Sequence, residues 1–344
     1  MSPELVSPYK HRAATMNALD PVRIVFLDRA TLPRDVSLEP LGFPHRMVEY
    51  DQTSSAQVAE RIAEADIAIT NKVGISADDL SAAERLKLIA IAATGADMID
   101  LDACARRRVL VSNVRKYAEN SVPEHVFALI FALRRQIVPY GRSISERAWE
   151  RAGQFCYFDY PISELRGTVL GIIGAGTLGR AVGRIGAALG MKVLFASRKG
   201  QEAKNEFYAP FHEVLMRSDV ISLHVPLNTE TRHMLSYNEF ASMERRPLII
   251  NTSRGGLIEE KALVKAIIEG QISGAGLDVV STEPPPANHP YFTLLDRPNF
   301  ILTPHVAWAS REAIVTLTRQ LRENLELWYA GKPRHLLGTG ENGA

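Results

Sequence analysis

One stretch of the sequence constrains the fold more than any other. Residues 168–179, TVLGIIGAGTLG, join an apolar run to three glycines at G-x-G-x-x-G spacing, and residues 180–190 follow with apolar side chains at helical spacing. This pattern predicts a strand, a tight turn and a helix in succession. The glycines would permit the turn, a close approach to a pyrophosphate and tight helix–strand packing, and the first helical N–H groups would bind the phosphates. We therefore expect a dinucleotide site formed by Gly174, Gly176, Thr177, Leu178 and Gly179.

Strand-like and helix-like segments alternate on both sides of this stretch. Before it, strands are predicted at 23–28, 66–70, 86–93 and 109–113, and helices at 54–64, 77–84 and 101–107. After it, strands are predicted at 191–196, 219–224, 247–251, 273–278 and 299–303, and helices at 211–217, 236–243 and 259–269. Such alternation is typical of parallel, doubly wound α/β sheets. The first series has no glycine fingerprint, so the dinucleotide site is expected in the second.

Three further segments are described by their pattern of apolar residues. Residues 122–138 form a predicted helix that is apolar nearly all round, so it must be buried on several sides, between two domains or against a second subunit. Residues 140–160 are rich in aromatic side chains and are predicted to be irregular. Residues 310–329 form a final amphipathic helix, whose docking surface the pattern does not decide.

Composition narrows the class of protein. The 344 residues are enough for two domains, and a net charge of +1 gives no sign of binding to nucleic acid or a membrane surface. No apolar run is long enough to span a membrane. Cys104 and Cys156 lie far apart without metal-ligand or disulfide spacing, which suits a reducing cytoplasm and predicts no metal site. Residues 1–20 lack a signal-peptide pattern and are predicted to be a flexible extension.

Chemically suggestive residues follow three strands of the second series. Arg254 comes after the strand at 247–251, Glu283 after the strand at 273–278, and His305 after the last strand. Ligands of open α/β sheets bind beyond the carboxyl ends of the strands. An arginine can grip a carboxylate, a histidine can exchange a proton near neutral pH, and a carboxylate can orient that histidine. Reduction of a 2-keto acid by hydride transfer needs these three functions.

Several motifs together resemble the D-isomer-specific 2-hydroxyacid dehydrogenase family, and most of all its glycerate dehydrogenase/hydroxypyruvate reductase branch. The resemblance covers about residues 22–332. The family-wide motifs, besides the glycine stretch, are TGADMIDLD at 94–102, NTSRG at 251–255, LDV at 277–279, EPP at 283–285 and TPH at 303–305. The branch motifs are QFCYFDYP at 154–161 and PHVAWAS at 304–310.

The resemblance implies an architecture and an activity. It implies a flavodoxin-like substrate-binding domain of residues 21–120 and 304–335, a dinucleotide-binding Rossmann domain of residues 121–303, and an active site in the cleft between them. It also implies a homodimer formed through the helix after Val122. The implied reaction is the reduction of small 2-keto acids (hydroxypyruvate and glyoxylate) by NAD(P)H to D-2-hydroxy acids (D-glycerate and glycolate), and the reverse oxidation.

The resemblance also implies roles for individual residues. Arg254 would bind the substrate carboxylate and carbonyl, His305 would be the acid/base, and Glu283 would pair with His305. Backbone amides of the other domain would hold the same carboxylate, at Lys72, Val73, Gly74 and Gly95. Further cofactor contacts are expected at Val225, Pro226, Thr231, Thr252, Ser253, Asp278 and Ala307.

The chain departs from the family pattern at the end of the second strand of the dinucleotide domain. NAD-dependent relatives keep an acidic residue there, which accepts the ribose hydroxyls. This chain has Ser197, Arg198 and Lys199 instead, with no carboxylate. A carboxylate would repel a 2′-phosphate, whereas these three residues can bind it. NADP is therefore the favoured cofactor, and NAD is the alternative if the two cations only face the adenine and water.

Two other functions stay open at this point. Some relatives are dinucleotide-sensing corepressors that keep the same three catalytic residues, so the motifs alone do not exclude a binding protein. A dehydrogenase for larger 2-keto acids is the second alternative. A phosphoglycerate dehydrogenase with a regulatory domain is disfavoured because the chain ends soon after Lys332. A formate dehydrogenase is disfavoured because it would carry a glutamine in place of Glu283.

Overall fold

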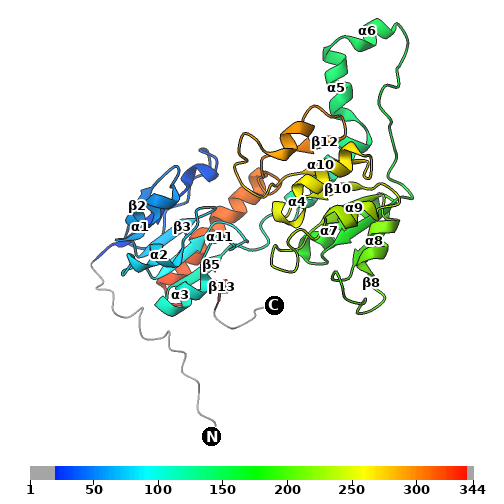
Figure 1. The fold of residues 1–344 in the computed structure, drawn as a ribbon. Helices are drawn as coiled ribbons and strands as arrows, with labels where there is room; N and C mark the ends of the chain where they lie inside the picture. The colour runs from blue at the N-terminus through cyan, green and yellow to red at the C-terminus, as the bar shows by residue number, and fades with distance from the viewer. Residues whose placement is uncertain (1–19, 339–344) are drawn as a thin grey trace. The chain divides into compact units, whose positions relative to one another are not determined.

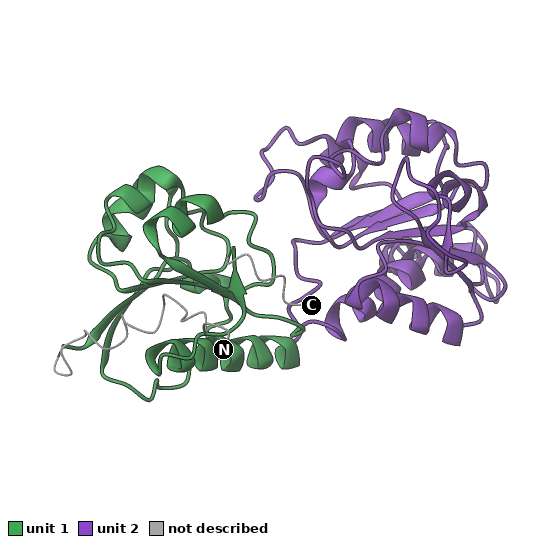
Figure 2. Cartoon of the chain, turned by 90° about the horizontal axis from the view of Figure 1, so that it is seen from below, with its two compact units in different colours: residues 1–117, 311–344 green, residues 118–310 purple. Residues whose placement is uncertain are grey.

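The computed structural model describes residues 20–338. The chain divides into two compact units, one of residues 1–117 and 311–344 and one of residues 118–310 (Figure 2). The predicted extension, residues 1–20, lies outside the described residues except for Asp20. No helix in the described part of the chain is long and apolar enough to cross a membrane.

The first unit contains a sheet in the order β13-β5-β4-β3-β1-β2. Its strands are β1 Val22–Phe26, β2 His45–Glu49, β3 Ile67–Thr70, β4 Leu88–Ile91, β5 Leu110–Asn113 and β13 Leu336–Leu337. All neighbours are parallel except β13, which runs antiparallel to β5. The order 2-1-3-4-5 is that of flavodoxin-like folds, as predicted. The central strands β3 and β4 are buried throughout, as expected of parallel strands covered on both faces.

Helices at both ends of the chain cover this sheet. They are α1 Val58–Ile62, α2 Ala77–Ser81, α3 Leu101–Arg107 and α11 Arg311–Tyr329 (Figure 1). Asp100 caps α3 by accepting a hydrogen bond of 2.8 Å from the Ala103 amide. In α11, Leu317, Leu321 and Leu325 are fully buried. The final helix, whose docking surface the apolar pattern left open and which the family resemblance assigned to the first domain, therefore packs in the first unit.

The second unit contains a seven-stranded parallel sheet in the order β12-β11-β10-β9-β6-β7-β8. Its strands are β6 Val169–Ile173, β7 Lys192–Ala196, β8 Tyr208–Ala209, β9 Val220–Leu223, β10 Leu248–Asn251, β11 Gly274–Leu277 and β12 Phe300–Leu302. The chain starts at the centre with β6, builds outward through β7 and β8, and then returns to build the other side from β9. This is the Rossmann order, in which the direction of strand addition switches between β6 and β9.

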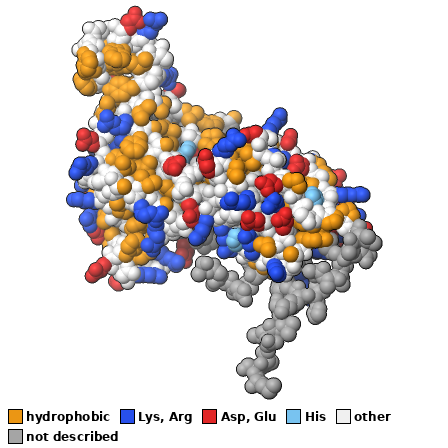
Figure 3. Space-filling view, turned by 180° about the vertical axis from the view of Figure 1, so that it is seen from behind, with side chains coloured by type: hydrophobic (Ala, Val, Ile, Leu, Met, Phe, Trp, Pro, Cys, Tyr) orange, Lys and Arg blue, Asp and Glu red, His pale blue; other side chains and the backbone are white. Residues whose placement is uncertain are grey.

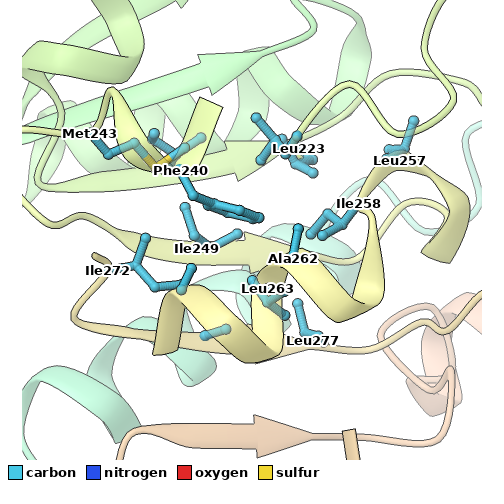
Figure 4. Close-up of a cluster of buried hydrophobic side chains, with 14 of the residues drawn as sticks. Leu223, Phe240, Met243, Ile249, Leu257, Ile258, Ala262, Leu263, Ile272 and Leu277 are labelled. Atoms are coloured by element: carbon cyan, nitrogen blue, oxygen red, sulfur yellow. The ribbon is translucent and has the colours of Figure 1, made fainter. Parts of the chain in front are cut away.

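Two apolar cores lie on the faces of this sheet. Helices α7 Thr177–Ala188, α8 Phe211–Arg217, α9 Tyr237–Ala241 and α10 Glu260–Ile268 alternate with the strands. Phe240 of α9 and Leu263 of α10 pack over Ile249 of β10 in one core (Figure 4). The predicted α/β class with parallel sheets is confirmed.

Helix α4, Ser121–Arg134, is shorter than the predicted helix at 122–138. The chain leaves it at Gln136, which has a left-handed backbone (φ 54°) and begins α5, Ile137–Ser145. Val126 and Ile130 of α4 are fully buried and share a core with β6 and β10. The apolar character of this helix therefore reflects packing inside its own unit rather than the predicted burial between two domains or against a second subunit.

The segment at 140–160, predicted to be irregular, is irregular only after Ala152, apart from the turn between its two helices. It contains most of α5 and the short helix α6, Ala148–Ala152, which extend from the second unit (Figure 1). Pro139 lies in the first turn of α5, where a missing N–H breaks no helical hydrogen bond. Phe155, which is 92% exposed, and Phe158, which is 82% exposed, lie in the irregular part that follows α6.

Candidate functional site

The glycine turn after β6 has the backbone geometry that a dinucleotide site needs. Gly174 has φ 110°, and a Cβ there would lie 2.3 Å from the His224 carbonyl oxygen. A Cβ on Gly179 would lie 1.9 Å from the Gly174 carbonyl oxygen, so only glycine allows α7 to start this close to the turn. A Cβ on Gly176 would meet nothing within 4 Å. The turn is therefore tight on its inner side and open at Gly176, where α7 begins without a side-chain cap.

The residues that begin α7 fit a phosphate-bearing cofactor. Thr177 and Leu178 are the first two residues of the helix, so their N–H groups lie among the four that no helical carbonyl accepts. Nearby, at the end of β9, desolvation lowers the pKa of His224 to about 4, which keeps its ring neutral. The open turn and the helix start thus fit a pyrophosphate, as the sequence predicts.

The three residues that follow β7 and are expected at the ribose differ in their exposure and contacts. Ser197 is buried, and its Oγ donates to the Gln201 carbonyl oxygen at 3.2 Å. Arg198 is exposed. Lys199 already has partners, because its Nζ lies 2.8 Å from Glu239 Oε1 and donates to the Met234 carbonyl oxygen at 3.0 Å. The two adjacent cations are therefore not equivalent.

The loops after β9 and β10 carry the other expected cofactor residues. Val225 and Pro226 directly continue from the end of β9, and Thr231 Oγ1 donates to the Pro226 carbonyl oxygen at 2.7 Å. Ser253 Oγ donates to the Leu223 carbonyl oxygen at 2.8 Å, which ties the two loops together. The Thr252 hydroxyl is buried and has no hydrogen-bond partner among the described residues. A bound cofactor would supply such a partner.

Asp278, expected at the cofactor, holds the turn that contains His305. Its carboxylate accepts the Thr303 hydroxyl at 2.5 Å and the amides of Val306 at 2.9 Å and Ala307 at 2.8 Å. Its own carbonyl oxygen accepts the His305 amide at 2.8 Å. The carboxylate is fully buried. Asp278 and Ala307 therefore have an anchoring role that the sequence did not reveal.

A second histidine supports the same anchor. His125 of α4 has its Nε2 at 3.0 Å from Thr303 Oγ1 and at 3.7 Å from Asp278 Oδ1. Because the threonine hydroxyl donates to Asp278, it accepts from His125. Sequence reasoning missed His125, since nothing at 125 indicates contact with a turn 178 residues later.

His305 and Glu283 form the predicted pair. His305 Nδ1 lies 2.6 Å from Glu283 Oε2, and Glu283 Oε1 accepts the Val280 amide at 3.2 Å. His305 has a left-handed backbone (φ 55°), and its carbonyl oxygen accepts the Trp308 indole N–H at 2.9 Å. With Nδ1 facing the carboxylate, Nε2 is the nitrogen that can exchange a proton with a substrate.

Arg254 follows the strand adjacent to that of Asp278. In the parallel sheet, Asn251 at the end of β10 is in register with Leu277 at the end of β11. Asn251 Nδ2 donates to the Arg254 carbonyl oxygen at 2.9 Å, which fixes the backbone of the turn. A Cβ on Gly255 would lie 1.9 Å from the Val280 carbonyl carbon, so this turn packs against the segment that leads to Glu283. The three predicted catalytic residues thus follow the ends of neighbouring strands.

In the first unit, the loop at 71–74 binds a carboxylate of the chain itself. Asp28, at the end of β1, is 3% exposed and accepts the amides of Asn71 at 2.9 Å, Lys72 at 2.6 Å and Val73 at 3.2 Å. Burial raises the pKa of Asp28, although these hydrogen bonds oppose the shift. Successive amides of this kind form an anion-binding concavity. The N–H groups of Lys72 and Val73, which were expected to hold the substrate carboxylate, thus donate to Asp28 in this structure.

The remaining expected substrate contacts of this unit are Gly74 and Gly95. Gly74 is exposed and lines a cavity of about 420 Å³ together with Asp28, Thr31, Gln52, Thr53 and Lys72. Gly95 is partly buried and follows β4. Asp28 itself was missed because its partners lie 43 to 45 residues away in the sequence.

Known proteins resemble the chain over nearly its whole length. The glycerate dehydrogenase of Methylorubrum extorquens is 46% identical over 316 residues, which cover 92% of this chain and 98% of that protein. The structure of an NADPH-dependent glyoxylate/hydroxypyruvate reductase from Sinorhizobium meliloti, in complex with NADP and malonate, matches with a TM-score of 0.77 at 26% identity, covering 90% of this chain and 94% of the other. The D-lactate dehydrogenase of Aquifex aeolicus, complexed with NAD and lactic acid, matches with a TM-score of 0.76 at 27% identity, covering 90% and 96%.

A family model gives the same assignment. The model described as D-isomer specific 2-hydroxyacid dehydrogenase, NAD binding domain, matches residues 127–307, which is more than half of the chain. The matched segment contains the glycine turn, Arg254, Glu283 and His305. The resemblance stated from the sequence is confirmed, and the chain belongs to the D-isomer specific 2-hydroxyacid dehydrogenase family.

Proposed function

We propose that this protein reduces hydroxypyruvate and glyoxylate to D-glycerate and glycolate with NAD(P)H, and catalyses the reverse oxidation. The observation that carries the proposal is the His305–Glu283 pair, with 2.6 Å between Nδ1 and Oε2, on the same sheet edge as the glycine turn. The glycerate dehydrogenase at 46% identity supports this choice of substrate. The enzyme names of the relatives favour turnover over a corepressor-like binding role.

Arg254, His305 and Glu283 have different roles in the proposed reaction. The reduced nicotinamide cofactor, when bound, supplies a hydride to the carbonyl carbon of the 2-keto acid. Arg254 binds the substrate carboxylate with its guanidinium fork and orients the carbonyl. His305 gives the proton on Nε2 to the carbonyl oxygen, so that no free alkoxide forms, and water restores the proton afterwards. Glu283 holds the ring through Nδ1 and stabilises its charged form.

A panel of initial rates tests the proposal. Glyoxylate, hydroxypyruvate, pyruvate and larger 2-keto acids are compared with NADPH and with NADH at one ionic strength. We expect the highest kcat/KM with hydroxypyruvate or glyoxylate. A maximum with larger 2-keto acids would favour the second dehydrogenase alternative, and cofactor binding without turnover of any 2-keto acid would favour the binding protein.

The role of Glu283 leads to a prediction about pH. Replacing Glu283 with Gln removes the negative charge 2.6 Å from His305 Nδ1 but keeps a side chain of the same size. The charged ring then loses its stabilising partner, so the protonated donor persists only at lower pH. We expect the pH optimum for reduction to move lower in Glu283→Gln, measured as kcat/KM against pH. An unchanged profile would contradict this role of Glu283.

NADP is the cofactor that we favour. Arg198 is exposed at the end of β7, Ser197 precedes it, and no carboxylate is present at 197–200 to repel a 2′-phosphate. The Sinorhizobium meliloti relative is NADPH-dependent, whereas the Aquifex aeolicus relative was solved with NAD.

Cytoplasmic location is proposed because the two cysteines, Cys104 and Cys156, are free and form no disulfide.

The second unit also offers a surface for a homodimer. Helices α5 and α6 and the residues after them expose a patch of apolar side chains: Ile137, Val138, Trp149, Phe155 and Phe158. Figure 3 shows apolar side chains gathered on this projecting segment. The dimer expected through the helix after Val122 is therefore proposed to use mainly α5 and α6, because α4 is covered by its own sheet.

Light scattering tests the dimer. At micromolar concentration we expect twice the mass of one chain, because each large apolar side chain gains ~1.5–3 kcal/mol on burial. Replacing Phe155 and Phe158 with Ser should shift the protein toward the monomer. Val315→Ser, which changes an exposed apolar side chain of α11, should leave the dimer intact. A monomer mass for the wild-type chain would overturn the assignment.

A further inference from the structure

The partners of Lys199 set it apart from Arg198. The Lys199 ammonium lies 2.8 Å from Glu239 Oε1, donates to the Met234 carbonyl oxygen at 3.0 Å, and lies 5.9 Å from the centre of the Phe211 ring. An ammonium has three N–H donors, so two are in use before any cofactor arrives. The Arg198 side chain is exposed and makes no hydrogen bond or ion pair to the other described residues, although its carbonyl oxygen accepts the Gln201 amide at 3.0 Å.

Glu239 is itself held in place. It is the third residue of α9, and its Oε2 accepts the Ser236 amide at 3.0 Å in a capping box. Its side chain is only 15% exposed. One carboxylate oxygen thus caps the helix while the other binds Lys199. The ion pair is therefore fixed by the fold from the α9 side, unlike a pair between two exposed flexible side chains.

This arrangement has two consequences for a phosphate at the end of β7. The positive charge of Lys199 is already compensated by Glu239, so the lysine attracts a second anion less strongly. The carboxylate of Glu239 is also a negative charge beside the cation that a 2′-phosphate would approach, and like charges repel. Both effects disfavour a cofactor with a 2′-phosphate and leave one with a free ribose hydroxyl unaffected.

We infer that Glu239 is a specificity-determining residue that limits the preference for NADP(H) by holding Lys199. The inference rests on the proposed function, in which residues 197–199 face the 2′ position of the cofactor. Arg198 then provides most of the attraction for the 2′-phosphate. Lys199 contributes less, because its ion pair with Glu239 compensates its charge. Neither the glycine motif nor the residues after β7 indicate Glu239, which is 40 residues from Lys199 in the sequence.

The test replaces Glu239 with Gln. Glutamine keeps the capping box, so α9 is retained while the charge is lost. Binding is measured by calorimetry with adenosine 2′,5′-bisphosphate and with 5′-AMP, and by fluorescence with NADPH and NADH, at fixed ionic strength. We expect Glu239→Gln to bind the bisphosphate and NADPH about five-fold more tightly. The affinities for 5′-AMP and NADH should stay within about two-fold of wild type, because neither ligand has a 2′-phosphate.

Two variants show whether the effect passes through Lys199. In a Lys199→Met background, Glu239→Gln should give no gain, since the restrained charge is absent. Glu213→Gln removes a carboxylate of α8 that pairs with Arg217 instead, and should change no affinity. An unchanged bisphosphate affinity in Glu239→Gln, or a gain that persists with Met at 199, overturns the inference.

Failure of the inference and failure of the proposed cofactor preference look different. If wild type prefers NADH and Glu239→Gln still gains bisphosphate affinity, the preference is wrong and the inference holds. If wild type prefers NADPH and Glu239→Gln gains nothing, the inference alone is wrong. If Glu239→Gln does not fold, the bisphosphate affinities of Arg198→Met and Lys199→Met are compared instead. Lys199→Met should lose less affinity than Arg198→Met, because Glu239 already compensates the charge of the lysine. Equal losses would overturn the inference.

Discussion

Replacing His305 with Ala is expected to lower kcat for hydroxypyruvate reduction by about 10²–10⁴-fold, the usual loss when a positioned acid is removed. The Nε2 proton has no substitute in the proposed mechanism, because Glu283 contacts the opposite nitrogen. Affinity for the cofactor should be retained, since the glycine turn lies at the end of a different strand. Stopped-flow single turnovers and cofactor fluorescence measure the two quantities separately.

The turn around His305 makes a second variant useful. His305 has φ 55°, a conformation that Asn adopts more readily than Ala. His305→Asn should therefore keep the turn held by Asp278 and Trp308 while still lacking an acid, and should lose as much activity as the alanine variant. His212→Ala, at an exposed histidine of α8, should retain wild-type rates. Near-full turnover in both His305 variants would show that another group donates the proton.

The second large effect concerns cofactor choice. We expect wild-type kcat/KM to be higher with NADPH than with NADH by about one to two orders of magnitude, because a charge-assisted pair with Arg198 contributes roughly 1.5–3 kcal/mol, part of which is lost to screening. Changing Ser197 to Asp and Arg198 to Gln should reverse the order. The new carboxylate repels the 2′-phosphate and accepts the ribose hydroxyls.

Salt dependence provides a check on this prediction. Raising the ionic strength should reduce the advantage of NADPH, since Arg198 is exposed and its attraction is screened. The preference for NADH in the double variant should depend less on salt. A wild-type enzyme that prefers NADH would mean that Arg198 does not attract the 2′-phosphate strongly enough to decide the cofactor, and the proposal of NADP would fail.

Much of the fold was predictable from local patterns. Residues 168–190 combine an apolar strand, glycines at fixed spacing and an amphipathic helix. These three patterns together indicate one strand–turn–helix unit. The strand β2, His45–Glu49, was missed because it lies at the edge of its sheet and none of its residues is buried. Helix α5 was missed because Gln136 breaks the apolar run and the following residues expose their apolar side chains.

The site was predictable where its residues follow the ends of neighbouring strands, and not where a residue acts through a partner on a distant element. Arg254, Glu283 and His305 each follow a strand, so the order of the strands was enough to place them. Asp28 and Glu239 act through partners some 40 residues away, on other elements. Their roles depend on which loops the fold brings together, and a single sequence does not show that.

The discontinuous first unit has a consequence for how the chain is made. Synthesis runs from the N-terminus, so all of residues 118–310 are made before α11 and β13. Until then, the inner face that α11 covers is bare, and β5 lacks its antiparallel neighbour. The dinucleotide unit, although it comes second in the sequence, is thus the first to have all its parts. The dinucleotide unit is thus one continuous segment, whereas the fold of the first unit is complete only when α11 and β13 join its sheet.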